Sequence, residues 1–475
     1  MRRRDLHLLP LLERDQPPLS RRTFLSGLSA AALAGCAGTA EDSAAPILSG
    51  AIEHVIFIMM ENRSFDHMMG SLKLLEGSAV DGLVEGMANT GNDGTVYPIA
   101  PSTIACLPSP PHSWDASHSQ YADGANTGFV TQYEDHGGDA AGEVMGYMTR
   151  VELPVTYALA DQFCLCEQWY CSVMGPTWPN RMFAHAGTSD GQKDNSLPQG
   201  GGFTFPTIWT HLDAIGVPWM YYYFDLPFIG IFDGHLKDGF HGFLEDFLDD
   251  CAKGTLPPVV WVDPGFTYND DHPPHHVSMG QEFIAAVFDA IGRSPLWEKC
   301  LVVLTYDEHG GFFDHVAPPT TDDDNAGDGF DQLGFRVPTL VVGPWVKQGL
   351  NSEEFNHTSW LKYLCEVYAI EPWTTRIATA PSLASCIDQD RMARNEPLPP
   401  PVIPGMEFID EDTLGSECFG GGLGPTAPPA SGEPEGSEGL GQPELRAFIR
   451  ARMPELDHTA SGPERLAAIR RRLRA

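Results

Sequence analysis

The sequence predicts an α/β fold in which helices cover both faces of a mostly parallel central sheet. Between about residues 52 and 388, short apolar, β-branched runs alternate with longer stretches of helical periodicity. Strands that are apolar along their whole length are typical of a sheet buried on both faces. Their alternation with helices favours a three-layer α/β/α sandwich. We therefore expect one large domain, residues 51–396.

Four runs are expected to form buried strands of this sheet, and two stretches are expected to form helices packed on it. The strands are expected at residues 53–60, 259–262, 301–306 and 337–342. The helices are expected at residues 281–292 and 357–368. In the first helix the apolar residues recur at helical spacing, which places them on one face against the sheet.

Polar side chains follow two of the expected strands at the point where each strand ends. Glu61 and Asn62 follow the run 53–60, and Asp307 and Glu308 follow the run 301–306. Ligands of open α/β sheets bind outside the carboxyl ends of the strands, so these residues are candidate site residues. Three carboxylates and an amide would repel one another unless a cation lay between them. Such an oxygen-rich set suits a hard divalent metal.

A third segment, residues 175–184, places a hydroxyl at the start of an expected helix. Pro179 suits the first turn of a helix, and Thr177 comes just before it. Backbone N–H groups at a helix N-terminus can hold a phosphate. A hydroxyl at that place, bound to a metal that lowers its pKa, is a plausible nucleophile, although a simple helix cap is also consistent with the pattern.

The two ends of the chain differ in composition from the central part. Residues 20–25 resemble a twin-arginine export signal, and Cys36 closes a short sequence that resembles a lipoprotein box. We expect a signal at residues 1–35, followed by a tether at residues 36–50. This address predicts a periplasmic or outer-surface lipoprotein with a lipid anchor to the membrane, or a secreted protein.

The C-terminal part is expected to contain a linker and a basic tail. Residues 397–442 are rich in Pro, Gly, Ser and Glu, which favours a linker. Residues 443–475 carry many arginines between apolar residues, which suits a helix that contacts an anionic membrane or the acidic body, and equally a solvated tail. The formal net charge of the whole chain is -35, which argues against nucleic acid as a partner.

Three cysteines lie close together in the sequence, at Cys164, Cys166 and Cys171. They could form one disulfide or bind a soft metal ion. Burial as small apolar side chains is the commoner role of such cysteines.

Three motifs together resemble the bacterial phosphoesterase family, which holds non-haemolytic phospholipases C and related acid phosphatases. They are Glu-Asn-Arg-Ser-Phe-Asp-His at 61–67, Gly-Pro-Thr-Trp-Pro-Asn-Arg at 175–181, and Tyr-Asp-Glu-His-Gly-Gly-Phe-Phe-Asp-His at 306–315. The resemblance covers about residues 52–388. It implies an alkaline-phosphatase-like sandwich and makes residues 51–396 the phosphoesterase catalytic domain.

The resemblance also implies roles for individual residues and the presence of a divalent metal ion. It leaves the identity of that ion open among Ca, Mg, Mn and Zn. The implied metal ligands are Glu61, Asn62, Thr177, Asp307 and Glu308. Thr177 is then also the nucleophile that becomes phosphorylated, and His112 and His272 surround the phosphate as catalytic histidines. The residues expected to bind substrate are Asn180, Arg181 and His357.

The expected reaction is hydrolysis of a phosphate ester through a phosphothreonine. The metal and the helix N-terminus would stabilise the transferred phosphoryl group, and a histidine would protonate the departing alcohol. The sequence leaves open whether the substrate is a monoester or a diester with a phospholipid head group. It also leaves the oligomeric state open.

The sequence suggests two alternative functions, a serine esterase and an inactive surface protein. Residues 187–191 fit the Gly-x-Ser-x-Gly pattern of serine esterases, with Ser189 as nucleophile, but that motif needs a strand before it and a helix after it. A helix-like stretch comes before it and a glycine-rich loop follows. The second alternative is a lipidated surface protein without activity, which predicts gaps in the set of metal-type residues. The sequence has no such gap.

Overall fold

The computed structural model describes residues 50–198, 201–236, 239–406, 408, 443–452, 467, 469–471 and 473. The expected export signal, residues 1–35, lies outside the described residues, as does the tether apart from its last residue. Of the expected linker, only residues 397–406 and 408 are described. All described residues belong to one structural unit of the chain.

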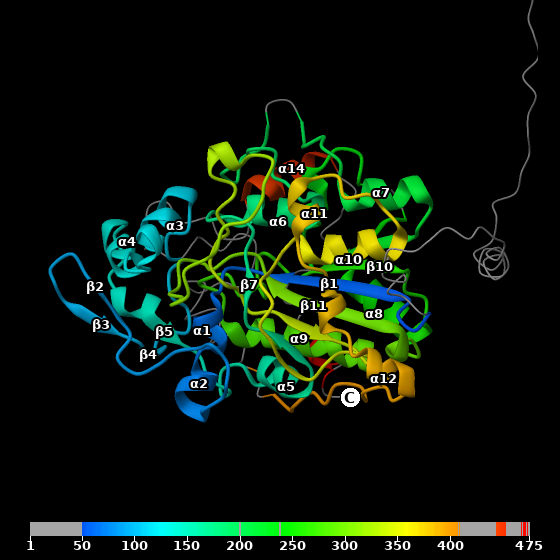
Figure 1. The fold of residues 1–475 in the computed structure, drawn as a ribbon, viewed down its shortest axis with the longest axis horizontal. Coiled ribbons are helices and arrows are strands. Elements are labelled where there is room, and N and C mark those ends of the chain that lie inside the picture. The colour runs from blue at the N-terminus through cyan, green and yellow to red at the C-terminus, as the bar shows by residue number, and fades with distance from the viewer. Residues whose placement is uncertain are drawn as a thin grey trace, which may run out of the picture. The chain divides into compact units, whose positions relative to one another are not determined.

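An eight-stranded sheet forms the centre of the fold (Figure 1). Its two longest strands, β1 (His54–Met60) and β11 (Cys300–Tyr306), are parallel neighbours and are buried along their whole length. This confirms the strands expected from the two apolar runs. The order across the sheet is β13 (Gly349–Asn351), β6 (Cys164–Cys166), β12 (Leu340–Val342), β11, β1, β10 (Val259–Asp263), β8 (Trp219–Tyr223) and β9 (His241–Phe243).

The sheet is mostly parallel, as the sequence predicts. Only β12 among its eight strands runs antiparallel to its neighbours, β11 and β6. β12 is also shorter than the expected strand at residues 337–342. Pro338 has no N–H to donate, and the N–H of Val337 donates instead to the carbonyl of Trp169, outside the sheet.

Helices cover both faces of the sheet, so the fold is a three-layer α/β/α sandwich (Figure 1). The helices on one face are α5 (Pro154–Gln162), α8 (Leu244–Lys253) and α9 (Val277–Gly292). Those on the other face are α6 (Thr177–Ala186), α7 (Ile208–Ile215) and α10 (Ser359–Tyr368). α9 and α10 confirm the two helices predicted from periodicity, and α9 begins four residues earlier than expected.

The remaining described elements are short. The helices are α1 (Phe65–Met69), α2 (Ser71–Glu76), α3 (Trp114–Tyr121), α4 (Phe129–Asp135), α11 (Thr375–Thr379), α12 (Gln389–Arg394) and α14 (Pro443–Arg452). The strands pair as β2 (Ala88–Thr90) with β3 (Val96–Pro98), β4 (Ala100–Pro101) with β5 (Gly146–Tyr147), and β7 (Trp169–Tyr170) with β14 (Phe355–Asn356). The 3₁₀ helices are η1 (Ala122–Gly124), η2 (Ala141–Met145), η3 (Phe228–Ile231), η4 (Trp297–Lys299), η5 (Ala326–Asp328) and η6 (Leu383–Cys386).

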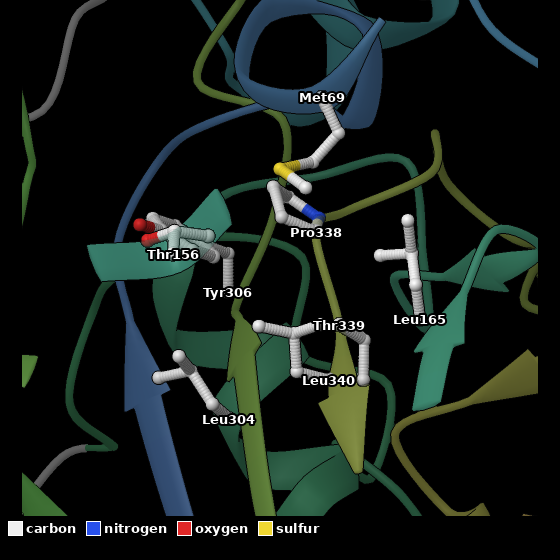
Figure 2. Close-up of a pocket in the computed structure, with 8 residues that line it drawn as sticks. All are labelled: Met69, Thr156, Leu165, Leu304, Tyr306, Pro338, Thr339 and Leu340. Atoms are coloured by element: carbon white, nitrogen blue, oxygen red, sulfur yellow. The ribbon is translucent and has the colours of Figure 1, made fainter. Parts of the chain in front are cut away.

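Aromatic side chains fill the layer between the sheet and α10. Phe57 on β1 stacks on Trp261 and on Trp360, with ring centroids 4.7 Å apart in each case. A separate narrow gap lies between β11, β12 and α1 (Figure 2). Met69, Leu304 and Leu340 are among the side chains that line it. It has no space for even a water-sized molecule, so it is a feature of core packing.

The described part of the basic tail packs on the acidic body. Leu445 and Ile449 of α14 are buried. Arg452 pairs with Asp233 at 2.7 Å, and Arg470 pairs with the buried Glu282 at 2.7 Å. The described part of the tail therefore contacts the acidic body, which is one of the two surfaces that its composition suggested. Among the described residues, no helix is long and apolar enough to cross a membrane.

Candidate active site

The ends of β1 and β11 lie side by side because the two strands run in register. Met60 is opposite Tyr306, so Glu61 and Asp307 leave the sheet together. The N–H of Asp307 donates to the carbonyl of Met60 at 3.1 Å, and the N–H of Asn62 donates to Asp307 Oδ1 at 2.9 Å. Glu61, Asn62, Asp307 and Glu308 are all buried. The fold therefore brings together the four expected metal ligands from the two strand ends.

Left-handed backbone conformations turn the polypeptide immediately after β1 and immediately after β11. Asn62 has φ of 61°, and Gly310 and Gly311 have φ of 64° and 75°. A Cβ atom on Gly310 would lie 2.1 Å from the carbonyl oxygen of Asn62, so only glycine fits. The N–H of Gly310 donates to Glu308 Oε2 at 2.7 Å, which fixes that carboxylate.

Thr177 is the first residue of α6, and its hydroxyl reaches the ends of the two strands. Thr177 Oγ1 donates to Asn62 Oδ1 at 3.3 Å. Asn180 holds the loop before the helix, because its side chain accepts from the N–H of Val173 at 3.0 Å and donates to the carbonyl of Gly175 at 2.9 Å. The polar atoms of Asn180 thus contact the backbone, so Asn180 positions Thr177 in this structure rather than facing a substrate.

Arg181 lies one turn along α6 and pairs with carboxylates from three strand ends. Its Nε is 3.2 Å from Asp307 Oδ2 and 3.5 Å from Glu61 Oε1, and one terminal nitrogen is 3.0 Å from Asp263 Oδ1. Burial by itself would lower the pKa of Arg181, but Asp307, Asp263 and Glu61 outweigh burial and raise it. Arg181 is therefore a permanent cation that holds the acidic residues in place, in contrast to the substrate contact expected from sequence.

Of the two predicted catalytic histidines, His112 contacts Asn62 and His272 contacts His112. Asn62 Nδ2 donates to His112 Nε2 at 3.1 Å, and His112 Nδ1 donates to the carbonyl of Pro110 at 2.6 Å. Glu308 Oε1 is 3.9 Å from His112 Nε2. The ring of His272 lies edge-on to that of His112, with centroids 5.9 Å apart. The structure thus brings His112 to the amide that contacts Thr177, with His272 next to His112.

His357 lies behind the acidic residues. Its Nε2 donates to the carbonyl of Asp307 at 2.6 Å, and its Nδ1 accepts from Trp169 Nε1 at 3.2 Å. Burial lowers the pKa of His357 to about 4, so the ring is neutral at pH 7. Both ring nitrogens are used within the protein. His357 therefore supports the Asp307 backbone, where sequence reasoning expected direct contact with substrate.

Sequence reasoning missed three acidic residues of the site. Asp263 ends β10, directly beside β1, and burial raises its pKa although Arg181 opposes the shift. Asp270 accepts from the N–H of Glu61 at 2.8 Å through its carbonyl, and its carboxylate pairs with His275 at 2.5 Å. Burial raises the pKa of the neighbouring Asp271 to about 7.

A signal for these residues was present in the sequence. Asp263 follows an expected strand, so the strand-end rule that identified Glu61 would also have identified Asp263. Asp270 and Asp271 precede the histidine-rich run at 272–276, from which only His272 was chosen.

The oxygen donors of the site fit a hard divalent metal ion. Three buried carboxylates, from Glu61, Asp307 and Glu308, lie with the Asn62 amide and the Thr177 hydroxyl, whereas Arg181 supplies one positive charge. A buried excess of negative charge is costly unless a cation offsets it. The chemistry of this donor set therefore suits calcium, magnesium or manganese, and zinc also accepts carboxylate ligands.

The structural context of Ser189 differs from that of an esterase nucleophile. Helix α6 precedes it and ends at Gly187, whereas the esterase motif requires a strand at that place. The hydroxyl of Ser189 donates to the carbonyl of Gln192 at 2.8 Å. The serine esterase alternative therefore lacks its structural context.

Comparison with known proteins shows which family the chain matches. Residues 52–371 match the model of the Phosphoesterase family. The chain is 32% identical to non-specific phospholipase C6 of Arabidopsis thaliana over 351 residues, which are 65% of this chain and 66% of the relative. It is 30% identical to non-specific phospholipase C3 of the same plant, over 76% of this chain and 78% of that one. It is 29% identical to phospholipase C A of Mycobacterium tuberculosis, over 73% and 80%.

Similar solved structures include a protein in the alkaline phosphatase superfamily from Vibrio parahaemolyticus, at 12% identity and a TM-score of 0.37 over 71% of each chain. This similarity is too low to carry an argument. The chain spans just under two thirds of the length of the first plant phospholipases that it matches. The family match covers most of the chain, includes all three motifs and confirms the resemblance on which their interpretation rests. The chain therefore belongs to the phosphoesterase family.

Proposed function

We propose that the protein hydrolyses phosphate esters, as a phospholipase C or an acid phosphatase does, through a phosphothreonine at Thr177. One observation carries the proposal. The side-chain amide of Asn62 links two other groups: its oxygen is 3.3 Å from Thr177 Oγ1, and its nitrogen is 3.1 Å from His112 Nε2. These residues come from segments far apart in the sequence, and a hydroxyl, an amide and an imidazole in that order suit phosphoryl transfer.

A divalent metal ion would be held by Glu61, Asn62, Thr177, Asp307 and Glu308. When bound, it would supply electrostatic stabilisation of the phosphoryl oxygens and lower the pKa of the Thr177 hydroxyl. Arg181 keeps Glu61 and Asp307 in place for this role.

The residues of the chain then divide the reaction between them. Thr177 Oγ1 gives its proton to solvent and attacks the phosphorus atom, a P–O bond to the threonine forms, and the bond to the substrate alcohol breaks. His112 or His272 protonates the departing alcohol oxygen. Water then attacks the phosphothreonine, releases phosphate or a phosphomonoester, and restores the hydroxyl of Thr177.

The substrate class follows from the relatives only as a proposal. The plant and mycobacterial relatives are named as phospholipases C, which favours a phosphodiester with a lipid alcohol. A phosphomonoester remains the second candidate. Comparing turnover of a phosphorylcholine diester with that of a simple phosphomonoester distinguishes the two.

The nucleophile is tested by replacing Thr177. Thr177→Ala should lower kcat by on the order of 10³-fold or more, because a residue that forms the covalent intermediate is lost. Thr177→Ser should keep measurable turnover. Thr207→Ala is the matched control, because Thr207 is also buried and caps the start of a helix, α7. It should lose about 1 kcal/mol of stability and keep kcat.

Turnover of a chromogenic phosphate ester and far-ultraviolet circular dichroism are the measurements. A folded Thr177→Ala enzyme with wild-type kcat would show that Thr177 is not the nucleophile. Absence of turnover by the wild-type protein on both monoesters and diesters would favour the inactive surface protein.

The metal requirement is tested by chelation. Prolonged treatment with a chelator should abolish turnover, and adding back calcium, magnesium, manganese or zinc one at a time should restore it, because the oxygen donors need a cation between them. The readouts are kcat and the bound metal content. Activity that survives complete metal removal but is lost with a serine-directed inhibitor would favour Ser189 instead.

A further inference from the structure

Three buried cysteines lie together at one side of the central sheet. Cys164 and Cys166 belong to β6, where residues two apart point to the same face, and Cys386 is the last residue of η6. Their sulfur atoms all lie within 4.8 Å of one another. Cys171, which sequence grouping placed with the first two, instead donates to the carbonyl of Val173 at 3.4 Å. The cluster is two strands away from β11.

The spacing of one pair of sulfur atoms matches that of two ligands to one metal ion, and the third sulfur lies within 4.8 Å of both. Cys166 Sγ and Cys386 Sγ are 3.9 Å apart. Two thiolates that each lie about 2.3 Å from a shared ion are separated by about 3.8 Å in tetrahedral geometry and about 4.0 Å in trigonal geometry. A disulfide would need about 2.05 Å. The pair is therefore spaced for a shared ion without further movement.

A second contact supports negative charge on the sulfur atoms. Asn351 Nδ2 lies 3.3 Å from Cys386 Sγ and 3.3 Å from Ser385 Oγ. Hydrogen bonds from outside the coordination sphere orient metal ligands and stabilise their charge. Asn351 ends β13, the edge strand, and is itself only partly buried. An ion could therefore enter from the edge of the sheet.

We propose that Cys164, Cys166 and Cys386 bind one soft cation, with zinc or monovalent copper as the fitting ions. Thiolates select such ions over calcium or magnesium. All three ligands are buried, so the ion would be shielded from solvent. It would tie η6 to β6, which lie 220 residues apart in the chain. The proposal is independent of the phosphoesterase activity.

The test uses cobalt as a spectroscopic probe in the full-length protein. Metal-free, reduced protein is titrated with cobalt, because thiolate ligands give a near-ultraviolet charge-transfer band that oxygen ligands do not give. We expect the band to reach its maximum at one equivalent and to disappear when zinc or monovalent copper is added. Elemental analysis after gel filtration measures the ion that remains bound.

The matched variants separate this cluster from other cysteines. Cys386→Ser should lose the band and about one equivalent of bound zinc or copper per chain. Cys300→Ser should keep both, because Cys300 donates to the carbonyl of Leu296 and lies outside the cluster. Cys164→Ser is the second variant if Cys386→Ser does not fold. Thr177→Ala should keep the band even if turnover is lost, so the two proposals fail independently.

Two results would overturn the proposal. One is wild-type protein that shows no charge-transfer band with cobalt and retains neither zinc nor copper through gel filtration. The other is peptide mapping that finds Cys166 joined to Cys386 in a disulfide in active, metal-replete protein.

Discussion

Asn62 was predicted only as a metal ligand, but in the structure it also links three other residues of the site by hydrogen bonds. Its backbone N–H donates to Asp307, its side-chain oxygen accepts from Thr177, and its side-chain nitrogen donates to His112. The Asn62 backbone and side chain can reach these three partners because Asn62 has φ of 61°. Asparagine tolerates this left-handed conformation better than most residues. The sequence identified Asn62 as a ligand by its place after a strand. The conformation that lets it contact three partners follows from the close approach of residues 307–311.

A second cluster of charged residues, beside the site, depends on the protonation of a histidine. His315 Nδ1 is 2.6 Å from Asp66 Oδ2, and His315 Nε2 is 3.3 Å from Asp81 Oδ1. Arg336 pairs with Asp66 at 3.2 Å and with Asp314 at 3.0 Å. Burial by itself would lower the pKa of His315, but the hydrogen bond to Asp66 outweighs burial and raises it. The charged imidazolium is thus the form that the fold favours.

The effect of this histidine on stability should depend on pH. A histidine whose pKa is raised by folding stabilises the protein below its unfolded pKa of about 6.5, and this contribution is lost as the pH rises through the folded value. His315→Gln should therefore lower the free energy of unfolding by about 1–2 kcal/mol at pH 5.5 and by less at pH 9. Urea denaturation at the two pH values measures this difference.

The matched control is His211→Gln, because burial lowers the pKa of His211. The pH dependence of its effect on stability should therefore have the opposite sign. A loss in His315→Gln that is equal at both pH values would contradict an ionic role for His315.

At the scale of single elements, the turn after β11 decides the shape of the site. Gly310→Ala should lower kcat by about 10²-fold, because its Cβ would meet the carbonyl of Asn62 at 2.1 Å and displace the group that contacts Thr177. Gly77→Ala is the matched control. Gly77 has the same left-handed conformation, with φ of 68°, but a Cβ there meets nothing within 4 Å.

Gly77→Ala should lose about 1 kcal/mol of stability from backbone strain, whereas Gly310→Ala should lose more, because of the clash with Asn62, and should also lose turnover. Steady-state kinetics and thermal unfolding measure the two effects. Equal kcat for Gly310→Ala and Gly77→Ala would show that the approach of Gly310 to Asn62 does not matter for catalysis.

The longest elements could be predicted from the sequence, whereas helices α5, α7 and α8 and the shortest strands were not predicted. β1, β11 and α9 are long apolar or periodic segments whose pattern reflects burial on both faces or on one face. β6 and β13 have three residues each and were not predicted. Strands this short are held by their neighbours in the sheet, so their own residues carry little signal.

At the scale of the whole molecule, the negative charge should affect which substrates reach the site. The formal net charge is -35. A doubly negative phosphomonoester is repelled by this field, and salt screens the repulsion as the Debye length falls from about 30 Å to about 8 Å. kcat/KM for such a monoester should therefore rise several-fold between roughly 0.01 M and 0.15 M ionic strength.

A zwitterionic phosphorylcholine diester is the matched control, because it has no net charge and should show little salt dependence. Stopped-time assays of both esters at constant pH measure the ratio. A monoester rate that falls with salt would show that local positive potential at the site dominates over the charge of the whole chain.

The composition of the basic tail does not show which surface the tail contacts, whereas the folded molecule does. Arginines between apolar residues suit either a membrane surface or the acidic body. In the described part of the tail, Arg452 and Arg470 pair with Asp233 and Glu282 of the body. Such a contact depends on which acidic residues face the tail after folding, and their place in the sequence does not show this.

The sequence by itself determined the layered α/β class, the family and the identity of the residues at the ends of β1 and β11. These follow from local patterns, because burial on both faces demands apolar strands and a site demands polar residues where strands end. Only the tertiary structure shows that the polar atoms of Asn180, Arg181 and His357 bond within the protein, that Asp263 and Asp270 lie close to the strand ends, and that Cys386 lies beside Cys164 and Cys166. The direction of a side chain and its partners across the sheet depend on contacts between distant segments, which no local pattern records.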